Sequence, residues 1–318
     1  MSKFDPYQHL GIRLNPDGTI TRLNNFPNTD ANPGIIPGLP TVSKDVTVND
    51  ETKVWARIFR PTKLPSNDNT VARLPIIFYF HGGGFVLYSA ANITTHQLCS
   101  ALASEITAIV IAVDHRLAPE HRLPAQYEDA VDTILWVKKQ ALDPDGEKWL
   151  RDFGDFTRCY LGGRGSGGNI AFHAALKALN NDIKPLNVIG IFLNQPMFGG
   201  QQRLLSELTY ATDQLTPLPV LDLLWELALP KGTDRDHRFC NPLEDEPYMS
   251  KASSIGRCLV ISFNMDPMFD RVQEFVDMMV RQGVHVEARC DLVGFHNIDL
   301  VDKQRCQAIL NIIKEFII

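Results

Sequence analysis

The sequence predicts an α/β fold in which helices cover both faces of a mostly parallel central sheet. Short runs of β-branched and other apolar residues alternate along the chain with stretches of helical spacing. The 318 residues, of which 44% are hydrophobic and 21% charged, can bury one large core. We therefore expect a single domain over residues 1–318, with cap elements that cover part of it.

Seven apolar runs are expected to form strands: Val54–Phe59, Pro75–Phe80, Ala108–Val113, Arg158–Gly162, Val188–Leu193, Cys258–Phe263 and His285–Arg289. Stretches with apolar residues three and four positions apart are expected to form helices. These helical stretches are Tyr127–Gln140, Asn169–Leu179, Arg271–Gln282 and Lys303–Phe316.

Two regions are expected to form a cap. The first is about residues 1–45, which are rich in Pro, Asn and Gly and carry two Asn-Pro turn signals. We expect an irregular arm there, with little regular structure. The second is residues 204–229, where Leu221, Leu224 and Trp225 belong to an apolar helical stripe. That stripe fits a core helix as well as it fits a substrate-facing lid.

The net charge of −6 gives no attraction to nucleic acid or to an anionic membrane, so neither partner is expected. The chain opens without an apolar leader and has no stretch near the ~18 apolar residues of a membrane span, which favours a cytoplasmic protein. Six scattered cysteines indicate free thiols and no metal site. A Gly-x-Gly-x-x-Gly match at 163–168 does not follow the first strand, so no nicotinamide or other cofactor is expected. A monomer and a homodimer both remain open.

Three adjacent glycines follow a predicted strand in His81-Gly82-Gly83-Gly84-Phe85. Because glycines carry no side chains, their backbone N–H groups are uncovered and can bind an anion. A glycine-rich turn also occurs for purely structural reasons, so this loop alone does not identify a function.

The segment that follows the next strand is more specific, and reads Asp114-His115-Arg116-Leu117-Ala118-Pro119-Glu120-His121. It resembles the Asp-Tyr-Arg-Leu-Ala-Pro-Glu-His signature of the hormone-sensitive-lipase-like branch of the α/β-hydrolases. That branch includes plant carboxylesterases, 2-hydroxyisoflavanone dehydratase and the gibberellin receptor. His115 replaces the usual Tyr and is expected to be a packed residue and not a catalyst.

The resemblance to plant carboxylesterases extends over nearly the whole chain, and we identify the chain as a member of that family. Membership implies the α/β-hydrolase fold, with a sheet of about eight strands and a cap over the site. It also implies a small-molecule substrate and an oxyanion hole to which Gly83 and Gly84 donate backbone N–H groups.

The segment Tyr160–Asn169 lies between a predicted strand and a predicted helix, where this family has its nucleophile elbow. Family members read Gly-x-Ser-x-Gly-Gly-Asn there, and Gly165 stands in the position of the serine. The nucleophile position is therefore vacant. The next residue, Ser166, is expected to complete the oxyanion hole with its backbone N–H. Ser166 as a displaced nucleophile stays an alternative, although its side chain is expected to point elsewhere.

An acid and a histidine follow in the chain order of the α/β-hydrolases. Asp266 comes after the strand Cys258–Phe263 and resembles the acid of the family's Asp-Pro-Leu-x-Asp loop, while Gly294-Phe295-His296 resembles the family's Gly-(Tyr/Phe)-His. A carboxylate against a histidine fixes the tautomer of the ring, so Asp266 and His296 are expected to act as a general acid–base pair. Asp266 could instead cap the following helix, and His296 could simply close a loop.

An apolar wall for the substrate pocket is expected from five residues, namely Phe85, Leu87, Tyr88, Leu218 and Trp225. Arg164, beside the elbow, is expected at the pocket as well, where its guanidinium could bind a substrate carboxylate.

Three functions remain open. The first is an enzyme of plant specialised metabolism that performs elimination, dehydration or cyclisation of a small oxygenated or ester-bearing metabolite without a covalent intermediate. The second is an ordinary carboxylester hydrolase, either with its serine deliberately replaced or with a water activated by His296. The third is a ligand-binding receptor or pseudoenzyme, which would not require the acid–base pair to be kept.

Overall fold

The computed structural model describes residues 4–67 and 70–318. Its centre is an eight-stranded sheet in the order β12-β11-β10-β9-β7-β8-β4-β3. The strands are β3 (Thr41–Asn49), β4 (Val54–Pro61), β7 (Leu74–Phe80), β8 (Ile109–Asp114), β9 (Gly154–Arg164), β10 (Val188–Asn194), β11 (Arg257–Phe263) and β12 (His285–Leu292). From β7 to β12 all neighbours are parallel, and only β3 and β4 are antiparallel additions at one edge.

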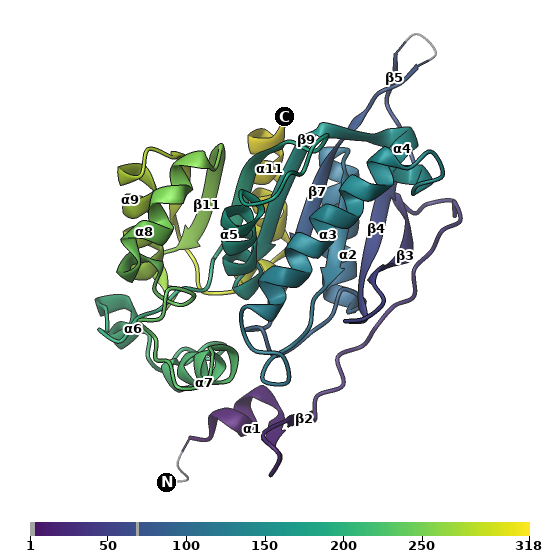
Figure 1. Cartoon of the computed structure of the whole chain (residues 1–318). Coiled ribbons are helices and arrows are strands. Elements are labelled where there is room, and N and C mark those ends of the chain that lie inside the picture. Colours follow the sequence, from purple (N-terminus) through teal and green to yellow (C-terminus); the bar gives the residue numbers. More distant parts are fainter. Residues whose placement is uncertain (1–3, 68–69) are drawn as a thin grey trace.

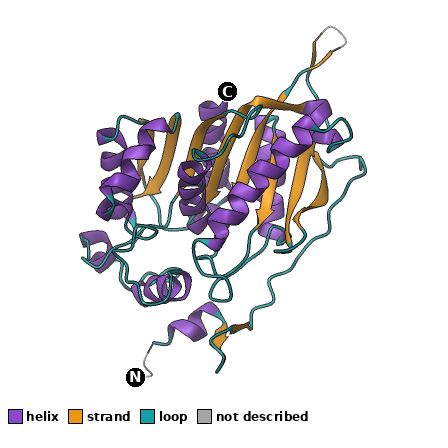
Figure 2. Ribbon diagram, viewed as in Figure 1, coloured by secondary structure: helices purple, strands orange, loops and turns teal. Residues whose placement is uncertain are grey.

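Helices lie on both faces of the sheet (Figure 1, Figure 2). The longer ones are α2 (Ile93–Ile106), α3 (Ala125–Leu142), α5 (Ser166–Ala178), α7 (Leu218–Ala228), α9 (Phe269–Arg281) and α11 (Lys303–Ile317). The shorter ones are α1 (Pro6–Leu10), α4 (Lys148–Phe153), α6 (Leu205–Thr209), η1 (Pro242–Glu244), α8 (Glu246–Met249), η2 (Ser250–Ser254) and α10 (Ile298–Val301). The remaining strands form two small hairpins: β1 (Ile12–Leu14) with β2 (Ile20–Arg22), and β5 (Ser66–Asn67) with β6 (Thr70–Val71).

Two hydrophobic clusters hold the layers together, one on each face of the sheet. α3, α5 and α9 pack on one face, and α2 and α11 pack on the other. Strand β7 lies between the two layers, and all seven of its residues are buried. This explains why its sequence is an unbroken apolar run and does not alternate with polar residues.

The predicted strands and long helices are confirmed and differ from the observed ones at their ends. The sequence prediction missed β3, whose outer half alternates half-buried and exposed residues, and α2, in which Thr and Ser interrupt the apolar spacing. The prediction that residues 1–45 have little regular structure is wrong in part. The arm contains α1 and the β1–β2 hairpin, and β3 begins at Thr41, while residues 1–3 lie outside the described ranges.

Parts of both regions expected to form the cap, namely α1 with the β1–β2 hairpin and α7, lie beyond the carboxyl ends of the parallel strands, whereas the later part of residues 1–45 runs along the sheet into β3 (Figure 1). There α1 contacts α7, the main helix of the 204–229 region. Helix α7 begins after Pro217 and is largely buried. Within the described ranges, no helix is both long and apolar enough to cross a bilayer.

Candidate active site

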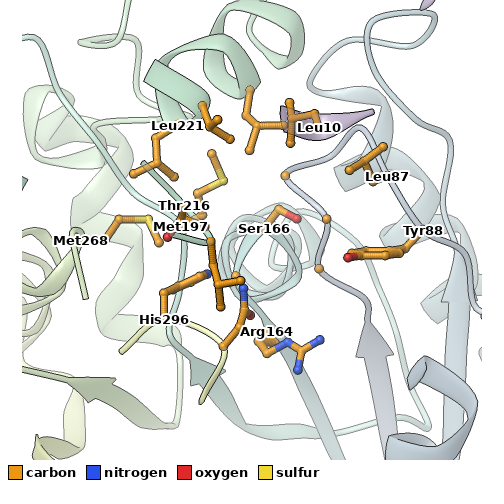
Figure 3. Close-up of a pocket in the computed structure, with 18 of the residues that line it drawn as sticks. Leu10, Leu87, Tyr88, Arg164, Ser166, Met197, Thr216, Leu221, Met268 and His296 are labelled. Carbon is orange, nitrogen blue, oxygen red and sulfur yellow. The ribbon is translucent and has the colours of Figure 1, made fainter. Parts of the chain in front are cut away.

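A cavity of about 120 Å³ lies where the loops at the carboxyl edge of the sheet meet the cap helices (Figure 3). Its floor consists of the glycine loop after β7, the turn between β9 and α5, and the loop after β12. Helices α1 and α7 contribute apolar side chains to the opposite wall. Such an edge of parallel strands is the usual place for a ligand in an α/β sheet.

The loops after β11 and β12 bring Asp266 and His296 together. Nδ1 of His296 lies 2.7 Å from Oδ2 of Asp266, and the Asp266 side chain is fully buried. Its other oxygen accepts a hydrogen bond of 2.9 Å from the N–H of Met268. A carboxylate held in this way favours the proton on Nδ1 and leaves Nε2 of His296, which lines the cavity, able to accept a proton.

The nearby Asp270 has a different role, because it accepts a hydrogen bond of 2.7 Å from the N–H of Ser206. Beyond His296, the N–H of Asn297 donates to Oε1 of Gln195 at 2.6 Å. This bond fixes the histidine loop to the residue after β10.

The turn between β9 and α5 has the backbone of a nucleophile elbow. Gly165 has φ 56° and ψ −121°, a backbone conformation that residues other than glycine rarely adopt. A Cβ at Gly165 would have one heavy atom within 4 Å apart from its chain neighbours, and that atom is Nε2 of His296, at 4.0 Å. The position therefore faces the histidine and has space for a side chain.

The glycine loop after β7 lines the cavity with Gly82, Gly83 and Gly84. Gly83 and Gly84 have φ of 105° and 62°. A Cβ would lie 2.3 Å from the Leu87 carbonyl oxygen at the first position, and 2.5 Å from the Leu224 side chain at the second. Neither N–H has an acceptor among the described residues. Both positions therefore require glycine, and both donors are free for a ligand.

Ser166 is the first residue of α5 and lines the cavity with 1% of its surface exposed. Its hydroxyl has no hydrogen-bond partner in the described part of the chain, and it is not bonded to His296. A nucleophilic hydroxyl would need a base within hydrogen-bond reach, so this arrangement does not favour Ser166 as a displaced nucleophile.

Arg164 lies at the cavity, but its guanidinium is held elsewhere. Nη1 is 3.3 Å from Oδ2 of Asp299, and both side chains are buried. Figure 3 shows the guanidinium pointing away from the middle of the cavity. Burial lowers the pKa of Arg164, but Asp299, together with Tyr79 and Tyr88, more than offsets this effect and raises the pKa above its usual value. The expectation that Arg164 binds a substrate carboxylate has no support in this arrangement.

The expected apolar wall is partly wrong. Leu87 and Tyr88 line the cavity, whereas Phe85, Trp225 and Leu218 do not. Phe85 and Trp225 are buried against each other, with ring centroids 5.4 Å apart, because the helical stripe of α7 continues into the core. The cavity is also lined by Leu10, Gly82, Met197, Leu215, Thr216, Val220, Leu221, Leu224, Met268, Asn297 and Leu300. Of these, Leu221 and Leu224 belong to the helical stripe for which a core helix and a substrate-facing lid were both open, whereas nothing in the sequence marks the loop residues.

The expectation that His115 is packed agrees with its surroundings. His115 is buried and stacks on His81 of the glycine loop, with ring centroids 4.1 Å apart. Nδ1 of each ring lies within hydrogen-bond distance of a neighbouring carbonyl oxygen. Burial, with a smaller contribution from the neighbouring His115, holds the pKa of His81 well below its usual value, so the His81 ring stays neutral beside the glycine loop.

Comparison with known proteins identifies the family and the fold. A family model described as the alpha/beta hydrolase fold matches residues 77–299. A probable carboxylesterase of Arabidopsis thaliana is 53% identical over 99% of this chain and 97% of its own length. A 2-hydroxyisoflavanone dehydratase of Glycine max is 37% identical over 82% of this chain and 80% of its own.

Among solved structures, an esterase of Pyrobaculum calidifontis superposes with a TM-score of 0.70. The two chains are 25% identical, and the alignment covers 86% of this chain and 85% of the esterase. Known relatives of this chain therefore include proteins named for ester hydrolysis and a protein named for dehydration.

Proposed function

The chain belongs to the plant carboxylesterase family of α/β-hydrolases, and from that premise we propose that it converts a small oxygenated or ester-bearing plant metabolite by acid–base chemistry at His296, without a covalent intermediate. The observation that carries this proposal is the pairing of a complete acid–histidine contact with an elbow that has no side chain. Nδ1 of His296 lies 2.7 Å from Oδ2 of Asp266, whereas Gly165 has no hydroxyl for the histidine to activate.

The proposed reaction begins when Nε2 of His296 removes a proton from a carbon beside a carbonyl group of the substrate. The resulting negative charge moves to the carbonyl oxygen, which the N–H groups of Gly83, Gly84 and Ser166 stabilise. The enolate then expels an oxygen leaving group from the neighbouring carbon, and the histidine returns its proton to that oxygen. A carbon–hydrogen and a carbon–oxygen bond break, a double bond forms, and water or a carboxylic acid leaves.

Elimination of this kind requires the Asp266–His296 pair and does not require a hydroxyl at position 165. The pair needs only a free Nε2, and among the described residues this atom has no hydrogen-bond partner. The dehydratase relative gives independent support, because its name describes loss of water by a protein that is 37% identical to this chain.

Ester hydrolysis by a water that His296 activates is a second candidate. The observation in its favour is the open space at Gly165, where a Cβ would meet only Nε2 of His296. A water in that space would occupy the position of a serine hydroxyl and could attack an ester carbonyl directly.

The isotope of water separates the two candidates. The chain is incubated with a plant metabolite extract in H₂¹⁸O, and consumed metabolites and new products are identified by mass spectrometry. His296→Ala in the same extract is the control. Elimination leaves the released acid free of ¹⁸O, whereas attack of water on an ester puts one ¹⁸O atom into the acid. If every metabolite that the wild-type chain converts is also converted by His296→Ala, the proposal of acid–base catalysis is wrong.

Location and assembly also belong to this proposal. We place the chain in the cytoplasm and expect a monomer or a homodimer. A fluorescent fusion would test the first expectation, and sedimentation of the purified chain would test the second.

A further inference from the structure

Two hydroxyl groups face the cavity without partners, and the proposed reaction uses neither of them. One is the Ser166 side chain, which is 1% exposed and whose oxygen has no hydrogen-bond partner among the described residues. The other is the phenol of Tyr88, a half-buried residue that lines the cavity and for whose oxygen no hydrogen bond to the described residues is found. Figure 3 shows both oxygens directed toward the same part of the cavity, one from the elbow helix and one from the glycine loop.

A buried hydroxyl without a partner is costly, because it has lost its bonds to water, at roughly 1–3 kcal/mol per group. At Ser166 no described protein group offers a hydrogen bond that would offset this loss, and much of the cavity wall is aliphatic. A ligand oxygen at this place would accept the missing hydrogen bond.

The backbone at Tyr88 indicates that its ring is held in place. Its φ is 74°, in the left-handed region that an aromatic residue rarely adopts. Its ring packs edge-on against Phe26 of the N-terminal arm, with centroids 4.5 Å apart. Burial raises the pKa of Tyr88, so the phenol keeps its proton and acts as a donor.

Among the described lining residues, the arginine side chain is already paired and does not compete with these two donors. Arg164 is the cationic side chain at the cavity, and Asp299 neutralises it. The remaining lining residues with hydroxyl or amide groups are Thr216 and Asn297. Thr216 already donates its hydroxyl hydrogen to Asp213 at 3.2 Å. The polar part of the cavity is therefore suited to a neutral oxygen and not to an ion.

We propose that the Ser166 and Tyr88 hydroxyls form a subsite that binds a second, uncharged oxygen of the substrate, such as a hydroxyl or an ether. This inference rests on the proposed function, in which the N–H groups of Gly83, Gly84 and Ser166 bind the reacting carbonyl. It adds that the substrate is neutral and carries another oxygen close to that carbonyl. The rest of the substrate is apolar, because the wall made by α1 and α7 is aliphatic.

Two matched probes test the subsite without requiring any reaction. N-phenyl-2-methoxyacetamide and N-phenylbutanamide have nearly the same shape, and differ in one ether oxygen that replaces a methylene group. Their dissociation constants for the wild-type chain are measured by isothermal titration calorimetry. We expect the methoxy compound to bind about tenfold more tightly, which corresponds to roughly one hydrogen bond.

The variants assign that preference to the two hydroxyls. Ser166→Ala and Tyr88→Phe should each reduce the preference severalfold while leaving the affinity for the butanamide unchanged. Thr216→Val is the matched control, because it removes a cavity hydroxyl that already has a partner, and it should keep the tenfold preference. Two separate variants protect the test against misfolding of one, which circular dichroism would detect.

Three results would overturn the subsite: equal affinity of the wild-type chain for both probes, no measurable binding of either probe, or a preference that survives in both Ser166→Ala and Tyr88→Phe. None of these results bears on the acid–base proposal, which depends on turnover by His296. Loss of His296-dependent turnover, in turn, would leave the binding preference in place.

Discussion

The turn at Gly165 and the Asp266–His296 pair lie on the same cavity floor, yet they differ in what they present to the cavity. The pair keeps its side chains in contact at 2.7 Å, whereas the elbow keeps its backbone conformation and no side chain. Close packing around the turn explains the difference. A Cβ at Gly163 or Gly167 would lie 2.4 or 2.0 Å from neighbouring backbone atoms. The shape of the turn is therefore set by glycine packing and does not depend on a serine.

The largest effect is expected at the pair. His296→Ala should lower turnover of the native substrate by ~10²–10⁴-fold, the usual contribution of a positioned acid–base group. Ser166→Ala should cost about tenfold or less, because its backbone donor remains. Steady-state kinetics on the metabolite identified in the extract would measure both. The assignment of roles is reversed if Ser166→Ala abolishes turnover and His296→Ala does not.

The second prediction concerns the ion pair that joins the two regions. Arg164 ends β9 beside the elbow, and Asp299 lies three residues after His296. Arg164→Met leaves the buried carboxylate without its cation, so the free energy of unfolding should fall by about 3 kcal/mol. Urea denaturation would measure it.

The double variant Arg164→Met with Asp299→Leu is the control, because it removes both charges and should recover most of the lost stability. Asn194 and Gln195 also donate to Asp299, at 3.2 and 3.3 Å. If Arg164→Met is as stable as the wild-type chain, these amides alone satisfy the carboxylate and the two regions are not coupled through Arg164.

The third prediction concerns a serine hydroxyl introduced at position 165. Gly165→Ser should raise hydrolysis of p-nitrophenyl acetate by on the order of 10²-fold, because the new side chain would point at Nε2 of His296. The positive φ would cost roughly 1–3 kcal/mol of stability. A burst of nitrophenol and labelling by a fluorophosphonate would show the acyl-enzyme route.

Gly165→Ala is the matched control, since it has the same backbone cost and no oxygen, and it should remain unlabelled. The unmodified chain should also remain unlabelled. Fluorophosphonate labelling of the unmodified chain at Ser166 would mean that the nucleophile has moved one residue along the turn.

The smallest effect concerns a histidine on the helix that follows the elbow. His173 is buried in α5, and burial lowers its pKa to about 3. The folded chain keeps it neutral, whereas the unfolded chain binds a proton below about pH 6.5. The contribution of His173 to the free energy of unfolding is therefore present above about pH 6.5 and is lost as the pH falls toward 3. This residue alone should lose about 2 kcal/mol between pH 6.5 and pH 5.

His173→Phe should flatten that part of the stability profile, measured by urea denaturation at several pH values. The phenyl ring can still pack against Tyr127 and Tyr248, which now flank the imidazole. The same substitution at the exposed His285 is the control, and it should leave the slope of stability against pH unchanged. An unchanged slope in His173→Phe would mean that His173 does not couple folding to protons.

The sequence predicts the sheet and the floor of the cavity well, because both depend on local patterns. The buried strands read as apolar runs, and Gly83, Gly165, Asp266 and His296 each follow a strand of the parallel part of the sheet. Since carboxyl ends of parallel strands share one edge, their order along the chain already predicts that they lie close together. Their roles in catalysis stay predictions.

The cavity wall could not be predicted, because it depends on contacts between distant segments. Leu10 reaches the cavity from α1 and Leu300 from α10, and neither belongs to a motif. Arg164 shows the same limit. Its position beside the elbow predicted a pocket residue, but only the fold reveals Asp299 as its partner. Phe85 and Trp225 were placed on the wall because they are large and near the site, and they pack on each other instead.

The glycine packing of the elbow also bears on how this family diversifies. Glycine codons GGT and GGC differ from the serine codons AGT and AGC at one nucleotide. Since the turn keeps its shape without a hydroxyl, a single base change at position 165 would place a hydroxyl beside His296 and leave the architecture intact. On the proposed function, hydrolytic and non-hydrolytic members would then be neighbours in sequence space, and a gene lineage would gain or lose the nucleophile without passing through a misfolded intermediate.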